Sequence, residues 1–511
     1  MRPRGQTEDI LRLGWHHSSS ESPFSMPHTV KRSSYQLTFA VLVLGVSAYA
    51  LLQSLVIPAL PTIQHDLHTT QNTVTWVVTA YLLSASIFTP IMGRVGDMVG
   101  KERMLVATLV ALAAGSAVAG LAHSIWILVL GRAIQGIGGG VLPLSFGIIR
   151  DEFPAARVAT AVGTIAAMTA VGGGLGLVIA GPIISHLNYH WLFWIPLIIC
   201  VIAAVSAQLF VPESPVRTPG RISWGAAVLL SGWLVALLIG VSQAPTWGWG
   251  SPEVLGLIAL AVVLCGLWIL VEVRSREPLI DMHMMRIPAV WTNNLVAFLF
   301  GVGMYSAMAF LPEFLQTPTS SGYGFGASIV RSGLFLLPLT VMMFLFGLLS
   351  GRIAARIGSK AAVIIGSCIS CTAYVVLALA HSQPWQIYTA STLLGIGLGL
   401  AFSAMSNLIV VAVPPAQTGV ASGMNANIRT IGGAVGAAVM SSIVAATIMP
   451  DGFPAESGYT IGFLFLAGVT LAAVIAAVFI PTTRDHADAH DEGHLPHAEL
   501  AMIPGGTLVD E

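Results

Sequence analysis

Apolar runs of about 20 residues recur along the whole chain, and no other feature restricts its fold so strongly. An α-helix rises about 1.5 Å per residue, so about 20 apolar residues cross the roughly 30 Å of hydrocarbon in a bilayer. Of the 511 residues, 55% are hydrophobic and only 9% are charged. A helix satisfies its own backbone hydrogen bonds, as a segment surrounded by lipid must. The sequence therefore predicts an all-α integral membrane protein.

We expect fourteen transmembrane helices. Their predicted ranges are 36–60, 73–93, 104–122, 125–149, 158–185, 191–211, 222–243, 253–273, 289–316, 329–350, 361–381, 386–412, 417–447 and 458–481. The odd-numbered connections between them contain no Lys or Arg, whereas the even-numbered connections are rich in these residues. Because loops that carry Lys and Arg stay in the cytoplasm, both chain termini are predicted to be cytoplasmic. A multi-pass protein of the cell membrane is the expected localisation.

The chain contains an internal repeat. The run at 93–101 is echoed at 351–360, 258 residues later, and the glycine-rich run at 136–140 is echoed at 395–399, 259 residues later. Such repeats are typical of transporters built from two related halves. We therefore expect two parallel six-helix bundles with a two-helix hairpin (helices 7 and 8) inserted between them. The predicted units are 36–211, 222–273 and 289–481.

Polar tails flank the membrane part. Residues 1–35 and 482–511 are expected to be disordered in the cytoplasm, because they lack the apolar residues of a core. The second tail carries four His among Asp and Glu, so the alternative is a helical face that binds metal or senses pH. All four Cys lie within apolar runs, and we expect neither a metal site nor a disulfide.

Three runs are similar to the motifs of a known family. They are Gly93-Arg94-Val95-Gly96-Asp97-Met98-Val99-Gly100-Lys101-Glu102-Arg103 after the second span, Arg132-Ala133-Ile134-Gln135-Gly136 in the fourth, and 413–423 before the thirteenth. On these runs, residues 36–481 resemble the major facilitator superfamily, and within it the fourteen-helix drug:proton antiporters of the EmrB/QacA type. The resemblance implies the major facilitator fold and alternating access to a central site. It also implies that the proton gradient supplies the energy, with no bound cofactor.

Two positions depart from the family pattern. The antiporter motif of the fifth span reads G-P-x-x-G-G, whereas this chain has a Pro only at position 182, one residue after Gly181. Many relatives also have an acidic residue in the first span, whereas residues 51–61 of this chain contain Gln53 and no acid. The resemblance to the antiporters stands, but the usual proton site is absent.

Ionisable groups inside the spans are the candidates for coupling transport to protons. Arg132 lies in the outer part of the fourth span, with Gln135 close to the same helical face. A cation at this depth belongs to the proton or substrate pathway, or else it is a structural pin bonded to backbone carbonyls. Glu313, near the outer end of the ninth span, is the substitute proton carrier, and the alternative is an ion pair with Arg331.

Charged and glycine residues at the end of the second span predict a cytoplasmic gate. Asp97 is expected to sit in a tight turn between Gly96 and Gly100, and to pair with nearby Arg residues or with the positive end of a helix in the other half. Ala355 replaces it in the second half. The predicted gate residues are Gly93, Arg94, Asp97, Gly100, Lys101 and Arg103. The candidates to line a mostly apolar cavity are Gln53, Asn293, Asn294, Tyr305, Met405 and Asn407.

Three functional classes remain open on the sequence. The first is a proton-driven exporter of drugs or other lipophilic or amphipathic small molecules, which we expect to work as a monomer in the lipid bilayer. The second is a proton-coupled symporter, or an exporter of one specific metabolite, on the same scaffold. The third is a membrane receptor or enzyme, and the sequence contains no P-loop, HExxH or nucleophile elbow to support it. We expect no enzymatic activity and no nucleic-acid partner.

Overall fold

The computed structural model describes residues 35–214, 223–275, 278–450 and 452–481. Within these ranges, fourteen helical segments are long and apolar enough to cross a membrane, and no strand is present. The predicted all-α fold with fourteen transmembrane helices is thereby confirmed. Apart from Tyr35, the predicted polar tails (1–35 and 482–511) lie outside the described residues.

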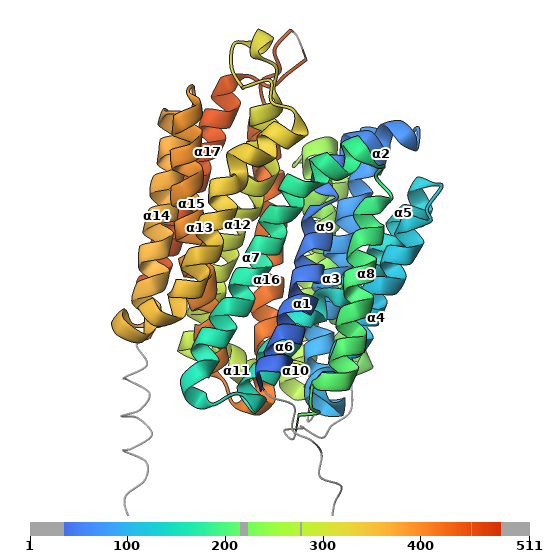
Figure 1. The fold of residues 1–511 in the computed structure, drawn as a ribbon, viewed down its shortest axis with the longest axis vertical. Helices are drawn as coiled ribbons and strands as arrows, with labels where there is room; N and C mark the ends of the chain where they lie inside the picture. Colours follow the sequence, from blue (N-terminus) through green and yellow to red (C-terminus); the bar gives the residue numbers. More distant parts are fainter. Residues whose placement is uncertain (1–34, 215–222, 276–277, 451, 482–511) are drawn as a thin grey trace, which may run out of the picture.

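The helices fall into two groups that stand side by side, with a hairpin against them (Figure 1). The first group comprises α1 (Tyr35–Ser54), η1 (Ile57–Ala59), α2 (Leu60–Asp66), α3 (Gln71–Val99), α4 (Lys101–Gly120), α5 (Ile125–Gly136), η2 (Ile137–Gly140), α6 (Val141–Glu152), α7 (Ala155–His186) and α8 (Trp191–Phe210). The hairpin and its linker comprise α9 (Trp224–Trp247), α10 (Pro252–Arg274) and α11 (Met282–Arg286). The second group comprises α12 (Pro288–Gln316), η3 (Thr319–Ser321), α13 (Ile329–Ile357), α14 (Ser359–Leu379), α15 (Pro384–Ala412), η4 (Pro415–Gln417), α16 (Thr418–Val444) and α17 (Glu456–Val478).

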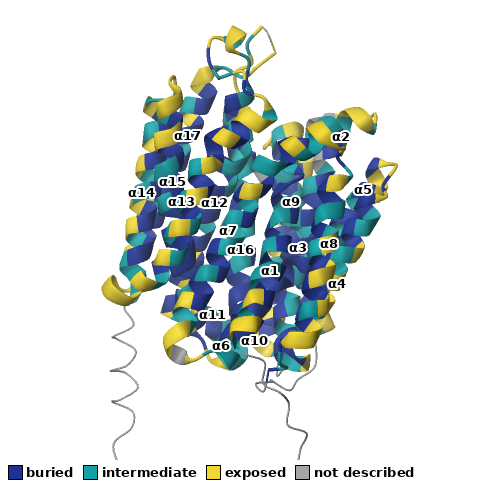
Figure 2. Cartoon of the chain, in the orientation of Figure 1, coloured by how far each residue is buried: buried dark blue, intermediate teal, exposed yellow. Residues whose placement is uncertain are grey.

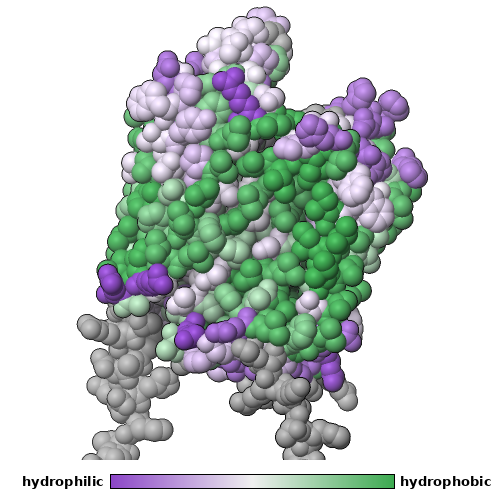
Figure 3. All heavy atoms as spheres, viewed as in Figure 1, coloured by the Kyte–Doolittle hydropathy of each residue, from purple (hydrophilic) through white to green (hydrophobic). Residues whose placement is uncertain are grey.

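A broad hydrophobic band covers the face shown in Figure 3, with hydrophilic residues gathered at its two ends. Exposed residues in Figure 2 include many positions along this band, as expected of helices that face lipid rather than water. We call the end at which α1 begins and α17 ends the basic end, because Lys101, Arg103 and Arg150 lie there. The opposite end is called the distal end.

Two helices, α3 and α13, extend beyond the predicted ends of their spans, and a glycine follows each of them. The predicted second and tenth spans stop at residues 93 and 350, whereas α3 continues to Val99 and α13 to Ile357. Gly100 follows α3 with φ of +133°, and Gly358 follows α13 with φ of +86°. Such angles suit glycine, which has no Cβ. Asp97 therefore lies in the last helical turn of α3, not in a turn between Gly96 and Gly100 as predicted.

Two spans are interrupted where glycine or proline is concentrated. Span 4 changes from α5 to a short 3₁₀ segment at Ile137–Gly140 and then to α6. The α-helix of span 1 ends at Ser54, and η1 with Pro58 follows. A stretch of 3₁₀ helix inside a span often marks a hinge. Both interruptions lie next to the cavity described below.

The two groups of helices meet along α3 with α16 and along α7 with α13. A Cβ on Gly93 would lie 2.6 Å from the carbonyl oxygen of Gly419, and a Cβ on Gly351 would lie 3.0 Å from the Cα of Thr160. Gly351 lies 258 residues after Gly93, and Gly419 lies 259 residues after Thr160, so the repeat relates one interface to the other. Close backbone contact of this kind is typical of helix packing in membranes.

The hairpin touches both groups, because α9 packs against α3 and against α16. Its second helix, α10, packs mainly on α9, and most of its surface is exposed. The hairpin therefore covers the α3–α16 side of the interface and places α10 toward lipid.

Candidate functional site: a central cavity and a gate at the basic end

A cavity of about 80 Å³ lies between the two groups of helices. It is lined by residues of α1, η1, α3, η2, α6, α7, α12, α13, α15 and α16. Drug-sized ligands occupy cavities of about 300–1,000 Å³. The cavity therefore admits such a molecule only when the two groups move apart.

Arg429 of α16 is the one charged residue among the described residues that line the cavity. Its guanidinium carbon lies 4.4 Å from the ring centroid of Phe402, and its Nε atom has no hydrogen-bond partner. The residue is only 5% exposed. It interacts electrostatically with the phenol groups of Tyr305 and Tyr49, and it is also hydrogen-bonded to Tyr305.

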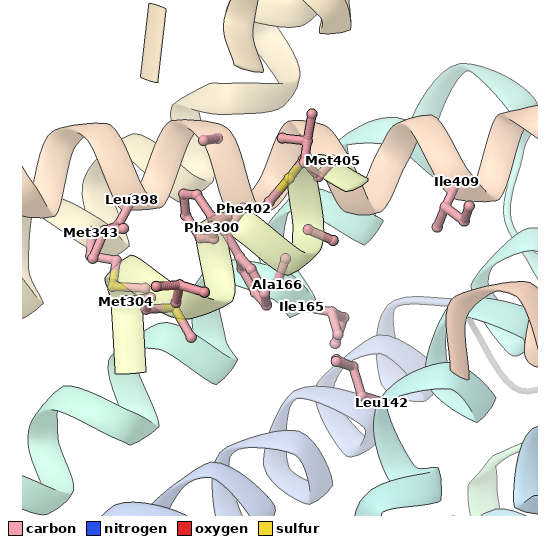
Figure 4. Close-up of a cluster of buried hydrophobic side chains, with 14 of the residues drawn as sticks. Leu142, Ile165, Ala166, Phe300, Met304, Met343, Leu398, Phe402, Met405 and Ile409 are labelled. Carbon is pink, nitrogen blue, oxygen red and sulfur yellow. The ribbon is translucent and has the colours of Figure 1, made fainter. Parts of the chain in front are cut away.

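The rest of the cavity wall is mostly apolar and rich in methionine. Met304 and Met308 come from α12 and Met343 from α13. Figure 4 shows Met304, Met343 and Phe402 within a buried hydrophobic cluster that continues to Leu142 of α6 and Ile165 of α7. Methionine side chains are flexible, so they adapt to ligands of different shapes.

Two of the six predicted cavity residues line this cavity, and they contact each other. The Gln53 side-chain amide donates to the Tyr305 hydroxyl at 3.3 Å, which joins α1 to α12. A glycine makes room for this tyrosine, because a Cβ on Gly433 would lie 2.5 Å from its ring.

The other four predicted residues lie outside the cavity. Asn293 donates to the carbonyl of Met405 in the α12–α15 contact, and Met405 itself is fully buried there. Asn294 accepts from Asn425 at 2.9 Å, and Asn407 donates to Ser359 at 3.2 Å. These side chains hold helices of the second group together because they face neighbouring helices of that group.

Arg132 is bonded to backbone carbonyls of two helices. Its Nε donates to the Val77 carbonyl of α3 at 3.1 Å, and one Nη donates to the Leu52 carbonyl of α1 at 3.0 Å. The Leu52 carbonyl is in the last turn of α1, where carbonyls lack helical partners. The guanidinium also lies over the Tyr81 ring at 4.2 Å. These contacts match the structural pin, one of the two roles predicted for this residue.

Gln135 extends the contacts of Arg132. Its amide oxygen accepts from Arg132 at 2.7 Å, and its amide nitrogen donates to Ser116 of α4 at 2.9 Å. Both residues are fully buried, and the second Nη of Arg132 has no hydrogen-bond partner. Neither residue is part of the cavity wall.

Glu313 lies near the distal end of α12, away from the cavity. Its side chain is exposed, and it accepts a hydrogen bond from the Tyr459 hydroxyl of α17 at 3.2 Å. Arg331 is exposed at the start of α13, and the ion pairs among the described residues do not include one between it and Glu313. The structure thus gives Glu313 a tyrosine partner that the sequence did not indicate.

The predicted gate residues gather at the basic end, between the two groups. The Asp97 carboxylate accepts from the backbone N–H of Val420 at 3.3 Å. Val420 is in the first turn of α16, where N–H groups lack helical partners and the helix dipole is positive. This is the predicted contact with the positive end of a helix in the other half. Ala355, at the corresponding place in the repeat, is exposed.

Lys101 links two buried acids below this contact. Its Nζ lies 3.6 Å from Asp97 and 2.5 Å from Asp151, which also accepts from Ser214. Lys101 and Asp97 are at most 1% exposed. A buried charge is tolerated only when it is paired, so these three residues form one connected network.

Arg94 and Arg103 lie toward the rim of the gate. Arg94 is half-buried and interacts electrostatically with Asp97 and with Glu272 of α10. Arg103 is exposed and pairs with Glu213 at 3.3 Å. Pairs that are open to solvent contribute little stability, so the buried network has the larger energetic role.

Arg150 is a gate residue that sequence reasoning missed. It lies in the last turn of α6, and one Nη donates to the Val410 carbonyl and to the Thr418 hydroxyl at 3.0 Å. Val410 is near the C-terminus of α15 and Thr418 begins α16. The first group thus places the carboxylate of Asp97 at the N-terminus of α16 and the guanidinium of Arg150 at the C-terminus of α15. Both placements are favoured by the helix dipoles. The RxxQG-like and loop motifs do not include this position.

Comparisons with known proteins agree with this architecture. The sequence profile of the Major Facilitator Superfamily matches residues 42–437. The tetracenomycin C resistance and export protein of Streptomyces glaucescens is 28% identical, over 86% of this chain and 82% of the relative. The multidrug transporter protein MdtP of Bacillus subtilis is 27% identical, over 80% of this chain and 74% of the relative.

A solved structure shares the fold. The crystal structure of the human organic anion transporter MFSD10 superposes with a TM-score of 0.63, over 86% of this chain and 99% of that chain, at 17% identity. The match of the family profile to most of the chain, together with the fourteen spans and the paired halves, decides the assignment. The chain belongs to the Major Facilitator Superfamily.

Proposed function

We propose that this protein is a proton-driven exporter of amphipathic small molecules that works by alternating access, in the manner of the fourteen-helix drug:proton antiporters. The observation that supports this most directly is the pairing of a central cavity with a closed gate at one end. Asp97 and Arg150 bind the α15–α16 corner across the interface, and the cavity lies beyond them. A protein in this conformation keeps its cavity shut off from the basic end.

The basic end is the cytoplasmic end in this proposal. Loops that carry Lys and Arg stay inside, and Lys101, Arg103 and Arg150 lie at this end. Both termini are then cytoplasmic, and the protein lies in the cell membrane. The closed gate corresponds to the stage at which substrate has no route back to the cytoplasm.

Export is favoured by the relatives. One is named for resistance to and export of tetracenomycin C, and another is named a multidrug transporter. The cavity wall of methionine and aromatic residues suits molecules with a large apolar surface. In this proposal no bound cofactor is needed, because the proton gradient supplies the energy. The protein works as a monomer and has no nucleic-acid partner.

Proton coupling has three candidate residues in this proposal, namely Arg132, Gln135 and Glu313. The first two hold the junction of α1, α3 and α5 next to the cavity, and the third is the carboxylate at the distal end of α12. A carboxylate binds and releases a proton, whereas the arginine remains charged and acts on its neighbours. Glu313 is therefore the proposed carrier and Arg132 the proposed positioning group.

A proton-coupled importer is the second candidate, because one relative of similar identity (26%) is named a uridine/deoxyuridine transporter. Purified protein in proteoliposomes separates the two functions. We expect an imposed pH gradient to drive a panel of fluorescent anionic, neutral and cationic compounds toward the side that corresponds to the exterior. Asp97→Asn protein and protein-free liposomes are the controls. Accumulation of uridine in the opposite direction, without movement of the panel, would contradict export.

A further inference from the structure

The wall of the cavity carries a positive charge, and the described residues that line it provide no acidic group to balance that charge. Arg429 is the charged residue of the wall, and none of the described residues that line the cavity is Asp or Glu. A cation with so little exposure needs partners, because burial removes its water. The groups that face it are the Phe402 ring and the phenols of Tyr305 and Tyr49.

Among the described residues, Arg132 is the other buried arginine of a span, and it lies outside the cavity. It is buried as Arg429 is, and it donates to two backbone carbonyls and to Gln135. Arg429 is hydrogen-bonded to the hydroxyl of Tyr305, which itself lines the cavity, and its Nε has no hydrogen-bond partner. The two arginines differ in position, because Arg429 lines the cavity and Arg132 does not. The Nε–H of Arg429 is thus available to a molecule in the cavity.

The surroundings of Arg429 indicate the rest of such a molecule. Phe402, Met304, Met308 and Met343 provide an apolar and aromatic wall. Rings stack favourably on aromatic side chains and pack well against methionine sulfur. The Gln53–Tyr305 pair adds neutral polar groups to the wall. One acidic oxygen on an aromatic or other apolar body would fit these groups.

We propose that the cavity selects amphipathic aromatic molecules with an acidic oxygen, such as a carboxylate or an ionised phenol, and that Arg429 binds that oxygen. Cationic compounds are disfavoured, because the cavity wall would place them beside a buried cation with no carboxylate to offset the repulsion. This inference rests on the proposed function for its role in export. Its test needs binding alone.

Two dyes with the same ring skeleton and opposite charge provide the test. Fluorescein is anionic at pH 7.4 and rhodamine 123 is cationic, and binding of each to the purified protein is measured by fluorescence anisotropy. We expect fluorescein to bind at least tenfold more tightly than rhodamine 123. Arg429→Gln should weaken fluorescein binding about tenfold or more, since a charge-assisted hydrogen bond is lost. Arg429→Lys should retain most of the affinity, because it keeps the charge.

Arg331→Gln is the matched control, because it removes the same charge from an exposed position at the start of α13, outside the cavity. It should bind both dyes as the unchanged protein does. Thermal unfolding and gel filtration establish that each variant is folded. If Arg429→Gln does not fold, the affinity of Arg429→Lys and the comparison of the two dyes on the unchanged protein still test the inference. Equal binding of both dyes, no binding of fluorescein, or full affinity in folded Arg429→Gln would overturn the inference. None of these results affects export of other compounds in proteoliposomes, so failure of the inference and failure of the proposed function are distinguishable.

Discussion

The carboxylate of Asp97, at the end of α3, accepts a hydrogen bond from the backbone N–H of Val420, at the start of α16, over 3.3 Å. The two residues are 323 positions apart and belong to different halves of the molecule. The contact places a negative charge at the positive end of a helix, inside an interface from which water is excluded. It exists only while the basic end is closed, so it stabilises one conformation relative to the other.

Replacing Asp97 by Asn should impair transport strongly while membrane insertion stays near normal. The amide carries no charge for the α16 dipole or for Lys101, and a partly buried interaction of this kind contributes about 1 to 2 kcal/mol. The ratio of closed to open conformations should fall about 5- to 30-fold. Dye transport in proteoliposomes measures this, with Glu253→Gln, an exposed acid, as the control. Normal turnover in Asp97→Asn would reduce Asp97 to a topology signal.

Gly93→Ala should keep the basic end from closing. A Cβ at this position would lie 2.6 Å from the carbonyl oxygen of Gly419, and backbone atoms of two helices cannot yield without moving the helices apart. We expect reduced transport and a higher reactivity of cytoplasmic thiol probes toward a cysteine introduced at Val420. Gly256→Ala in α10 is the control, since its Cβ would meet nothing within 4 Å. Equal thiol reactivity in both variants would contradict the role of this contact.

Arg132→Lys should lower both stability and transport. Lysine keeps the charge but lacks the planar fork that reaches the Leu52 carbonyl, the Val77 carbonyl and Gln135 together. Loss of a hydrogen bond from a charged group costs about 1.5–3 kcal/mol, which a thermal unfolding assay in detergent detects. A variant that unfolds normally and has lost only pH-driven transport would instead place Arg132 in the proton pathway.

Glu313→Gln should abolish uphill efflux driven by a pH gradient, because an amide keeps the shape and hydrogen bonding of the carboxyl group but does not titrate. Movement down the substrate gradient should persist. Tyr459→Phe separates the two roles, since it removes the hydrogen bond to Glu313 and leaves the acid in place. If Glu313→Gln still concentrates substrate against its gradient, the coupling site lies elsewhere and the Glu313–Tyr459 bond holds α12 to α17.

Reporter fusions test the assignment of the basic end to the cytoplasm. Fusions after Gly248 and Ser320 should report an external location, and fusions after Ser275 and Ser359 a cytoplasmic one. The first pair lies in loops of the distal end and the second pair at the basic end. A cytoplasmic signal at Gly248 would mean that the α9–α10 hairpin does not cross the membrane.

The sequence alone determined the spans and their pairing into repeats. Apolar length is a local property, and each span needs only enough residues to cross the bilayer, so the predicted ranges agree with the observed helices to within a few residues at most ends. Where they differ, as at the ends of α3 and α13, polar residues form the last helical turns and a glycine with positive φ ends each helix. A hydropathy pattern does not predict these last helical turns, because they are not apolar.

The functional contacts depend on residues that are far apart in the chain, and only the tertiary structure decided them. Asp97 was singled out by its motif, but its partner Val420 and the role of Arg150 follow from how the α15–α16 corner meets the first half. Arg429 had no sequence signal beyond its position in a span, because its significance lies in its place on the cavity wall with an unpartnered Nε. Asn293 and Met405 contact each other outside the cavity wall, which the sequence did not indicate, because the sequence of one helix does not show which neighbouring helix each side chain faces.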